Sequence, residues 1–261
     1  MKILVAVKQV ARLEGEPAFE SPTAVAADAL EWELNEWDAF SLEAAMQLSE
    51  AGEGGEVVVV ATVGDEGAEE VLLACLAKGA DRAVRVWDPS LEGADSLAVA
   101  AVLAALAKRE EPDLILGGVQ SSDAANAATA VALAGLLDLP RVAVVKEIEL
   151  DGEQLTVQRE LDGGAVEVLR LPLPALLTVQ TGINEPRYAS LRAIKQARGK
   201  PLDNFGLADL GLSAEEVQAA AGSRTVALGV PERGEGAAML DGPPSAIAER
   251  IAEIVREQVR V

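Results

Sequence analysis

The chain has 261 residues, half of them hydrophobic, and a formal net charge of −21 at pH 7. This length and apolar content predict a globular protein, and the negative charge disfavours binding to nucleic-acid phosphates or anionic membrane surfaces. Because the chain has no histidine and one cysteine, it cannot form a Ser-His-Asp triad, a histidine general base or a Cys/His zinc site.

The single cysteine, Cys75, lies in an apolar helical pattern, so we interpret it as a buried hydrophobe and not as a reactive thiol. One cysteine leaves no intrachain disulfide, which fits a reducing compartment, and we expect a cytoplasmic location. The N-terminal apolar run, residues 3–7, is closed by Lys8 and predicts a strand, not a targeting segment. No apolar run approaches the roughly 20 residues of a membrane span, so we expect a soluble chain.

Short β patterns alternate with helical patterns along the first half of the chain. The expected strands are residues 3–7, 57–63, 83–87, 114–118 and 142–148, and the expected helices are 39–51, 68–78, 91–109 and 123–137. This alternation predicts an α/β fold with right-handed crossovers and a doubly wound, mainly parallel sheet. The connection 9–38 is longer than helix packing needs, which is typical of a segment that serves a ligand or partner.

In open sheets of this type a ligand lies outside the carboxyl ends of the strands. The loops there carry neither the phosphate-binding loop of nucleoside triphosphatases nor Gly-x-Gly-x-x-Gly. The strongest candidate is 116–123, a strand end that runs into small residues and an alanine-rich helix. Its glycines allow close approach, and Ser121, Ser122 and the first helical N–H groups offer donors to an anion. A simple capped turn without a ligand has the same composition.

The second half of the chain changes pattern. Asp162-Gly163-Gly164 between two β-rich runs predicts a tight hairpin. The prolines of the returning arm, residues 169–178, argue against a central strand there.

A loop-rich tail follows, with several helix signals. Ser190 is expected to cap a short helix, and Ser213 caps a later one. A final amphipathic helix is expected near 244–256, with apolar positions at helical spacing at Ile247, Ile251, Ile254 and Val255.

The order of these features, together with Asn184-Glu-Pro-Arg-Tyr-Ala-Ser-Leu191, resembles the beta subunit of the electron-transfer flavoproteins. These heterodimers carry electrons from flavin dehydrogenases, including those of fatty acid oxidation, toward the quinone pool. The resemblance implies a nucleotide-binding domain at 1–200 that includes the hairpin 153–173 and a partner-recognition loop at 184–197. Residues 201–261 would form an arm that contacts the alpha subunit. The apolar stripe of the final helix fits equally well with packing on the chain's own sheet.

The resemblance also implies a buried structural AMP. Carried over residue by residue, its positions are Ala6, Asn35, Glu36, Trp37, Asp38, Val63, Gly118, Val119, Gln120, Ser121, Ser122, Asp123, Asn126 and Thr129. Small Ala6 admits the base, and the side-chain amides of Asn35 and Gln120 can bond to the base edges or ribose. The chain departs from the family in two places: 35–38 replaces an Asn-Pro-aromatic loop, and the helix start after Asp123 is rich in alanine. The Asp-Gly-Asp-Thr signature of relatives with a second FAD is absent, which favours AMP.

In the family, FAD lies mainly in the alpha subunit and is only touched by beta. Trp37 aligns with a family aromatic, and contact with the flavin and packing in the core are equally compatible with its position. Glu160 matches a family glutamate that pairs with an alpha-subunit arginine; a solvated strand glutamate is the alternative.

The recognition loop carries an apolar anchor formed by Tyr188, Leu191 and Ile194. In the family the leucine contacts partner dehydrogenases. Arg187, Arg192 and Lys195 flank it, which gives the apolar centre and polar rim typical of a binding hot spot.

The leading interpretation is therefore a non-catalytic electron-carrier subunit, whose redox chemistry belongs to bound FAD. Its expected partners are the alpha subunit, acyl-CoA and other flavin dehydrogenases, and a quinone-linked oxidoreductase. The alternative is a stand-alone adenine-nucleotide-binding protein or nucleotide hydrolase of similar fold. The missing histidines and phosphate loop weigh against hydrolysis.

Overall fold

The computed structural model describes residues 1–52, 57–232, 234 and 236–258. The chain divides into two compact units, Met1–Leu228 and Gly229–Val261. Unit 1 is an α/β domain, and the described part of unit 2 contains one helix, α7 (Pro244–Gln258).

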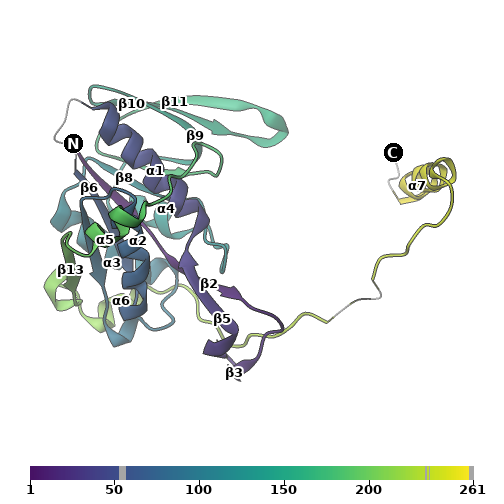
Figure 1. Ribbon diagram of the computed structural model, residues 1–261, viewed down its shortest axis with the longest axis horizontal. Coiled ribbons are helices and arrows are strands. Elements are labelled where there is room, and N and C mark those ends of the chain that lie inside the picture. The colour runs from purple at the N-terminus through teal and green to yellow at the C-terminus, as the bar shows by residue number, and fades with distance from the viewer. Residues whose placement is uncertain (53–56, 233, 235, 259–261) are drawn as a thin grey trace. The chain divides into compact units, whose positions relative to one another are not determined.

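A nine-stranded sheet runs through the first unit (Figure 1). Its order is β11-β10-β9-β12-β8-β1-β6-β7-β13. The strands are β1 (Lys2–Ala6), β6 (Val57–Val63), β7 (Arg82–Val86), β8 (Leu114–Gly118), β9 (Arg141–Asp151), β10 (Gln154–Glu160), β11 (Val166–Pro172), β12 (Ala175–Val179) and β13 (Leu202–Phe205). Only β10 is antiparallel to its neighbours, β9 and β11; the other pairs are parallel. Strand order reverses at β1, which pairs with β6 on one side and β8 on the other, as in doubly wound sheets.

Helices cover both faces of the sheet. Helices α1 (Glu36–Ala51), α2 (Glu69–Ala77) and α5 (Leu191–Ala197) pack on one face, and α3 (Ser96–Glu110), α4 (Thr129–Leu136) and α6 (Ala214–Ala220) pack on the other. Alternate side chains of β1 serve the two cores: Ile3 and Val5 pack in the first and Leu4 in the second. Because the central strands are buried on both faces, their sequences are nearly continuous aliphatic runs.

The predicted fold class and all five predicted strands are confirmed, and so are the first two helices within a few residues. The third helix begins at Ser96, five residues later than predicted, because Gly93 has a positive φ of 68° and Asp95 caps the helix.

The predicted helix at 123–137 is wrong in its first six residues, because α4 begins only at Thr129. Ala125 and Ala127 each have a φ of 49°, which interrupts any helix there. Contacts distant in sequence hold this loop: Lys8 Nζ lies 2.6 Å from Asp123 Oδ1, and the Ser122 N–H bonds to Asn35 Oδ1 at 3.2 Å. Alanine content predicted a helix, and these tertiary contacts prevented it.

The hairpin at Asp162–Gly164 is confirmed between β10 and β11, and both of its glycines have positive φ angles. The prediction for the returning arm holds for β11, which is an edge strand. It is wrong for β12, which follows Pro174 directly and is buried at the centre between β8 and β9. A proline just before a strand removes no hydrogen bond from the strand itself, so Pro174 does not prevent β12 from being a central strand.

The long connection after β1 forms two small antiparallel strand pairs: β2 (Gln9–Leu13) with β5 (Leu30–Leu34), and β3 (Phe19–Ser21) with β4 (Ala24–Val25).

Cys75 is fully buried, as predicted, and burial raises the pKa of its thiol to about 12. Among the described residues, no helix combines the length and apolar character needed to cross a membrane.

The first compact unit, Met1–Leu228, includes elements that follow residue 200. β13 is an edge strand of the sheet, and Val217 of α6 lies in the second core. The predicted helix cap at Ser213 is confirmed by a reciprocal pair of hydrogen bonds with Glu216. Residues 201–228 thus lie within the first compact unit.

Candidate functional site

A cavity of about 520 Å³ lies at the carboxyl ends of β1, β6 and β8, where the fold predicts a ligand. Ala6, Val63 and Gly118, the last residues of these strands, form part of its wall. The cavity also receives Asn35 and Asp38 from the start of α1. Segments far apart in the chain thus meet at the reversal of strand order.

Most of the cofactor positions expected from the sequence line this cavity: Ala6, Asn35, Asp38, Val63, Gly118, Val119, Gln120, Ser121, Asp123, Asn126 and Thr129. Glu36, Trp37 and Ser122 do not line it. Trp37 instead donates from Nε1 to Gln180 Oε1 at 2.9 Å. The backbone N–H of Ser122 is bound to Asn35. These two residues therefore support the loops around the cavity.

Asn35 connects α1 to the loop that follows β8. Its side chain is buried, with Nδ2 donating to the Gln120 carbonyl at 2.9 Å and Oδ1 accepting from the Ser122 N–H at 3.2 Å. Both ends of the amide already have protein partners. Asn35 therefore shapes the loop that follows β8, a role that the sequence reasoning did not include.

Asp38 is buried and lines the cavity. Its Oδ2 accepts from the Lys8 N–H at 2.8 Å and its Oδ1 from the Gly118 N–H at 2.9 Å. Burial raises the pKa of Asp38 to about 7, although these hydrogen bonds favour the ionised form. The carboxyl group therefore joins β1, α1 and β8 and changes charge near neutral pH.

Lys8 is a cavity residue that the sequence reasoning did not include. Its ammonium group contacts Asp123 at 2.6 Å and Ser121 Oγ at 3.3 Å. Burial opposes ionisation of Asp123, but the contact with Lys8 outweighs it and the pKa of Asp123 is lowered. A lysine placed directly after a buried strand was the available signal, because that position lies at the carboxyl edge of the sheet.

Asp95 also lines the cavity, and the sequence reasoning did not include it. Its Oδ1 caps α3 by accepting from the Leu97 and Ala98 N–H groups. Its Oδ2 accepts from the N–H groups of Gly222 and Ser223, at 2.8 and 2.7 Å. Asp95 thus fixes a distant segment beside the cavity. The Asp-Ser helix start was visible in the sequence, whereas the second pairing was not.

The expected partner residues lie on the surface. Tyr188 is 99% exposed and Leu191 81%, and Ile194 is about half-exposed. The predicted cap at Ser190 is confirmed by a bond from the Ala193 N–H. Glu160 lies at the end of β10 and pairs with Lys146 Nζ at 2.7 Å.

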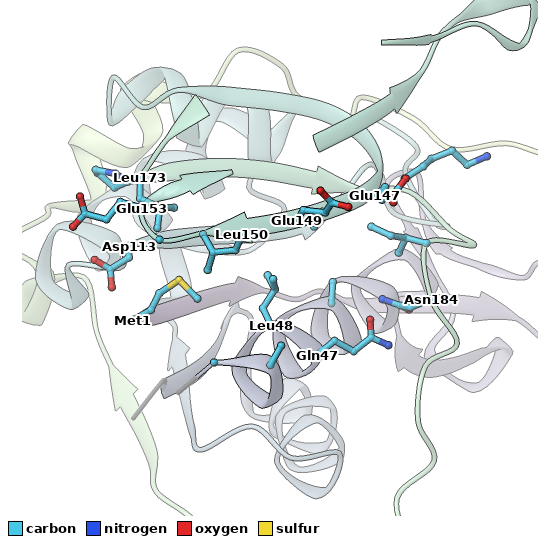
Figure 2. Close-up of a pocket in the computed structure, with 18 residues that line it drawn as sticks. Met1, Gln47, Leu48, Asp113, Glu147, Glu149, Leu150, Glu153, Leu173 and Asn184 are labelled. Carbon is cyan, nitrogen blue, oxygen red and sulfur yellow. The ribbon is translucent and has the colours of Figure 1, made fainter. Parts of the chain in front are cut away.

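A larger hollow of about 1090 Å³ lies between α1 and β9. Figure 2 shows Leu48 on α1 facing Leu150 on β9, with Met1 beside them. Four carboxylates line this hollow: Asp113, Glu147, Glu149 and Glu153. None of the predicted site residues lies here.

Fold and cavity together define an α/β protein with an open, doubly wound sheet and a ligand-sized cavity at its carboxyl edge. The sequence profile described as "Electron transfer flavoprotein domain" matches residues 23–210. The chain belongs to the electron transfer flavoprotein family and, within it, to the beta subunits.

Three relatives illustrate the similarity. The electron transfer flavoprotein subunit beta of Methylophilus methylotrophus is 46% identical over 261 residues, covering 98% of each chain. That of Bacillus subtilis is 36% identical and covers 90% of each chain. That of Homo sapiens is 37% identical and covers 81% of this chain and 84% of the relative.

Proposed function

We propose that this chain is the beta subunit of a heterodimeric electron carrier, that it binds AMP in the carboxyl-edge cavity, and that it helps an alpha subunit hold FAD. The heterodimer passes electrons from flavin dehydrogenases, including acyl-CoA dehydrogenases, to a quinone-linked oxidoreductase. The observation that carries the nucleotide assignment is the convergence of the strand ends, the Gly118 turn and Lys8 on one cavity.

The charges in the cavity favour a monophosphate over a longer phosphate chain. Among the described residues that line it, Lys8 is the only cation, whereas Asp38, Asp95 and Asp123 bring three carboxyl groups. A triphosphate would meet more repulsion than one lysine offsets. The absence of a phosphate-binding loop points the same way.

FAD is the redox group, and this chain contributes contacts around it. Glu160 is proposed to pair with an arginine of the alpha subunit. Its present pair with Lys146 is exposed on both sides and is therefore worth at most about 1 kcal/mol, so exchanging the partner costs little. Trp37 is half-buried and bonded to Gln180, and we assign it to packing beneath the loops.

The Leu191 loop is proposed to dock partner dehydrogenases. Three apolar side chains project from one capped turn, and Leu191 is the most exposed leucine among the large exposed hydrophobics. An apolar side chain of this exposure on a rigid turn suits insertion into a partner's pocket.

The helix of the second unit is proposed to contact the alpha subunit. None of its described residues is buried, and Ile251 and Val255 are about half-exposed. Its apolar positions lie at helical spacing, so a partner surface can cover them as one stripe. A cytoplasmic location remains our expectation from the single buried cysteine.

The test is to purify the chain alone and with its alpha subunit, denature both samples and analyse the released small molecules. We expect FAD only in the heterodimer and one AMP per beta chain. Two FAD per heterodimer would contradict the AMP assignment. Stoichiometric FAD or ATP turnover with the isolated chain would instead favour the stand-alone nucleotide protein.

A further inference from the structure

Arg187, next to the proposed docking residues, is bonded to side chains of its own domain. Its guanidinium group bonds to two glutamates of α1, with Nε 2.7 Å from Glu43 and an Nη atom 2.6 Å from Glu50. The backbone N–H of Arg187 also donates to Glu43 at 3.1 Å. The charge of Arg187, which the sequence places beside the anchor as part of a polar rim, is paired with Glu43 and Glu50 within the chain.

These contacts are stronger than an ordinary surface pair. The Glu43 side chain is 6% exposed, so its carboxylate depends on Arg187 for compensation. The hydrogen bonds that Arg187 donates to Glu43 and Glu50 raise the pKa of Arg187 further above its ordinary value, and those that Glu50 accepts from Arg187 lower the pKa of Glu50. Planar bidentate geometry also fixes direction, which a lysine cannot do.

The rest of the loop is attached in the same inward manner. Asn184 Nδ2 donates to the Phe40 carbonyl of α1 at 3.1 Å. After the recognition loop, Lys200 Nζ donates to three carbonyls in and just after the last turn of α2, those of Leu76, Gly79 and Ala80. The exposed residues between these attachments are thus held at both ends by helices of the domain.

We infer that Arg187 is a positioning residue, which holds the turn carrying Tyr188, Leu191 and Ile194 in its docking geometry before a partner arrives. The physical reason is preorganisation: a loop already ordered in the free protein pays no ordering entropy on binding. This inference rests on the proposed docking role of Leu191. It adds that the anchor is effective only on a fixed turn.

The structure supplies a matched control in Arg82. Like Arg187, Arg82 bridges one buried glutamate and one exposed acid: Glu110, with a side chain 6% exposed, and Asp203, 44% exposed. The two arginine side chains are 26% and 31% exposed. Arg82 lies on β7, outside the docking loop. Loss of either arginine removes the guanidinium partner of a buried glutamate, although Lys2 Nζ remains 3.5 Å from Glu110. Only Arg187 positions the turn.

The experiment compares Arg187→Gln, Arg187→Lys and Arg82→Gln in the FAD-loaded heterodimer. An acyl-CoA dehydrogenase reduced by its substrate serves as electron donor, with the heterodimer as acceptor. We expect Arg187→Gln to raise the KM for the heterodimer about tenfold with kcat within about twofold, and Arg187→Lys to recover part of this loss. Arg82→Gln should leave KM within about twofold, and FAD content should not change.

Hydrogen exchange provides a second readout that needs no dehydrogenase. The Ala193 and Ile194 N–H groups are protected by bonds to Ser190, so a loosened turn exposes them. Peptides covering this turn should exchange at least about tenfold faster in Arg187→Gln than in Arg82→Gln. If Arg187→Gln does not assemble, Arg187→Lys against Arg82→Lys carries the same comparison.

The outcomes separate the two proposals. Equal KM and equal exchange in the Arg187 and Arg82 variants would overturn the positioning role, even if Leu191→Ala impairs docking. An unchanged KM for Leu191→Ala, with faster exchange in Arg187→Gln, would overturn the docking role and leave Arg187 only as a support of the loop.

Discussion

The carboxylate of Asp38 and the backbone N–H of Gly118 meet at 2.9 Å and join the first turn of α1 to the end of β8. The fit leaves no room for a side chain. A Cβ at Gly118 would lie 2.5 Å from Asp38 Oδ1 and 2.6 Å from Trp37 Cβ. Close approach, and not a special φ angle, is what requires glycine at this position.

Gly118→Ala is therefore expected to destabilise the protein by about 1–3 kcal/mol and to lower its AMP content, because the turn and α1 must move apart. The neighbouring Gly117→Ala is the control: its new Cβ lies 3.5 Å from Ala130 Cβ, an ordinary contact. Urea unfolding and nucleotide analysis measure both effects. Equal stability of the two variants would contradict the close-approach argument.

The raised pKa of Asp38 predicts a pH dependence of stability. Between the ordinary aspartate pKa of 3.8 and the folded pKa of about 7, the folded protein keeps a proton that the unfolded chain has lost. The free energy of unfolding therefore falls as pH rises through this window, by up to about 4 kcal/mol from this group.

Asp38→Asn removes that titration. Its amide cannot accept from both the Lys8 and Gly118 N–H groups, so the variant has a lower stability overall. The informative quantity is the trend: the unfolding free energy of the variant relative to the native chain should rise between pH 4.5 and 7.5. A constant difference across this range would show that Asp38 does not titrate there.

Asp95 connects the start of α3 with Gly222 and Ser223 beside the cavity. Asp95→Ala should cost about 1 kcal/mol through the lost helix cap. It should also speed AMP dissociation about tenfold, because the wall that Ser223 and Thr225 provide loses its attachment. Asp88→Ala is the control, since Asp88 caps a short helix at Ser90 and does not line the cavity. Equal dissociation rates in the two variants would refute this role.

Leu191→Ala tests the docking anchor directly. We expect slower reduction of the heterodimer by a partner dehydrogenase, with a loss of about 2 kcal/mol in binding, roughly a 30-fold weaker complex. Flavin content and unfolding free energy should stay unchanged, because the side chain is 81% exposed. Leu136, 53% exposed at the end of α4, provides a control for the loss of exposed apolar area. Reduction kinetics that match those of Leu136→Ala would exclude the anchor.

Part of the candidate site could be predicted from the sequence because its signals are local. The strand at Leu114–Gly118 is a buried aliphatic run that ends in glycines, and the topology then places that end at the ligand edge. The cap at Ser190 and the turn at Gly163 likewise depend on neighbours within a few residues.

Local patterns along the chain were enough to predict the alternation of strands and helices, the buried faces, the hairpin and the family motif around Leu191. Three features became visible only in the folded chain: 119–128 is a loop, β12 lies at the centre of the sheet, and Arg187 is paired with Glu43 and Glu50. The physical reason is range: periodicity and capping depend on neighbouring residues, whereas Asn35 meets Ser122 and Arg187 meets Glu43 only after the chain has folded. At 123–128, polar contacts with residues distant in the sequence outweighed the local helix propensity of the alanines.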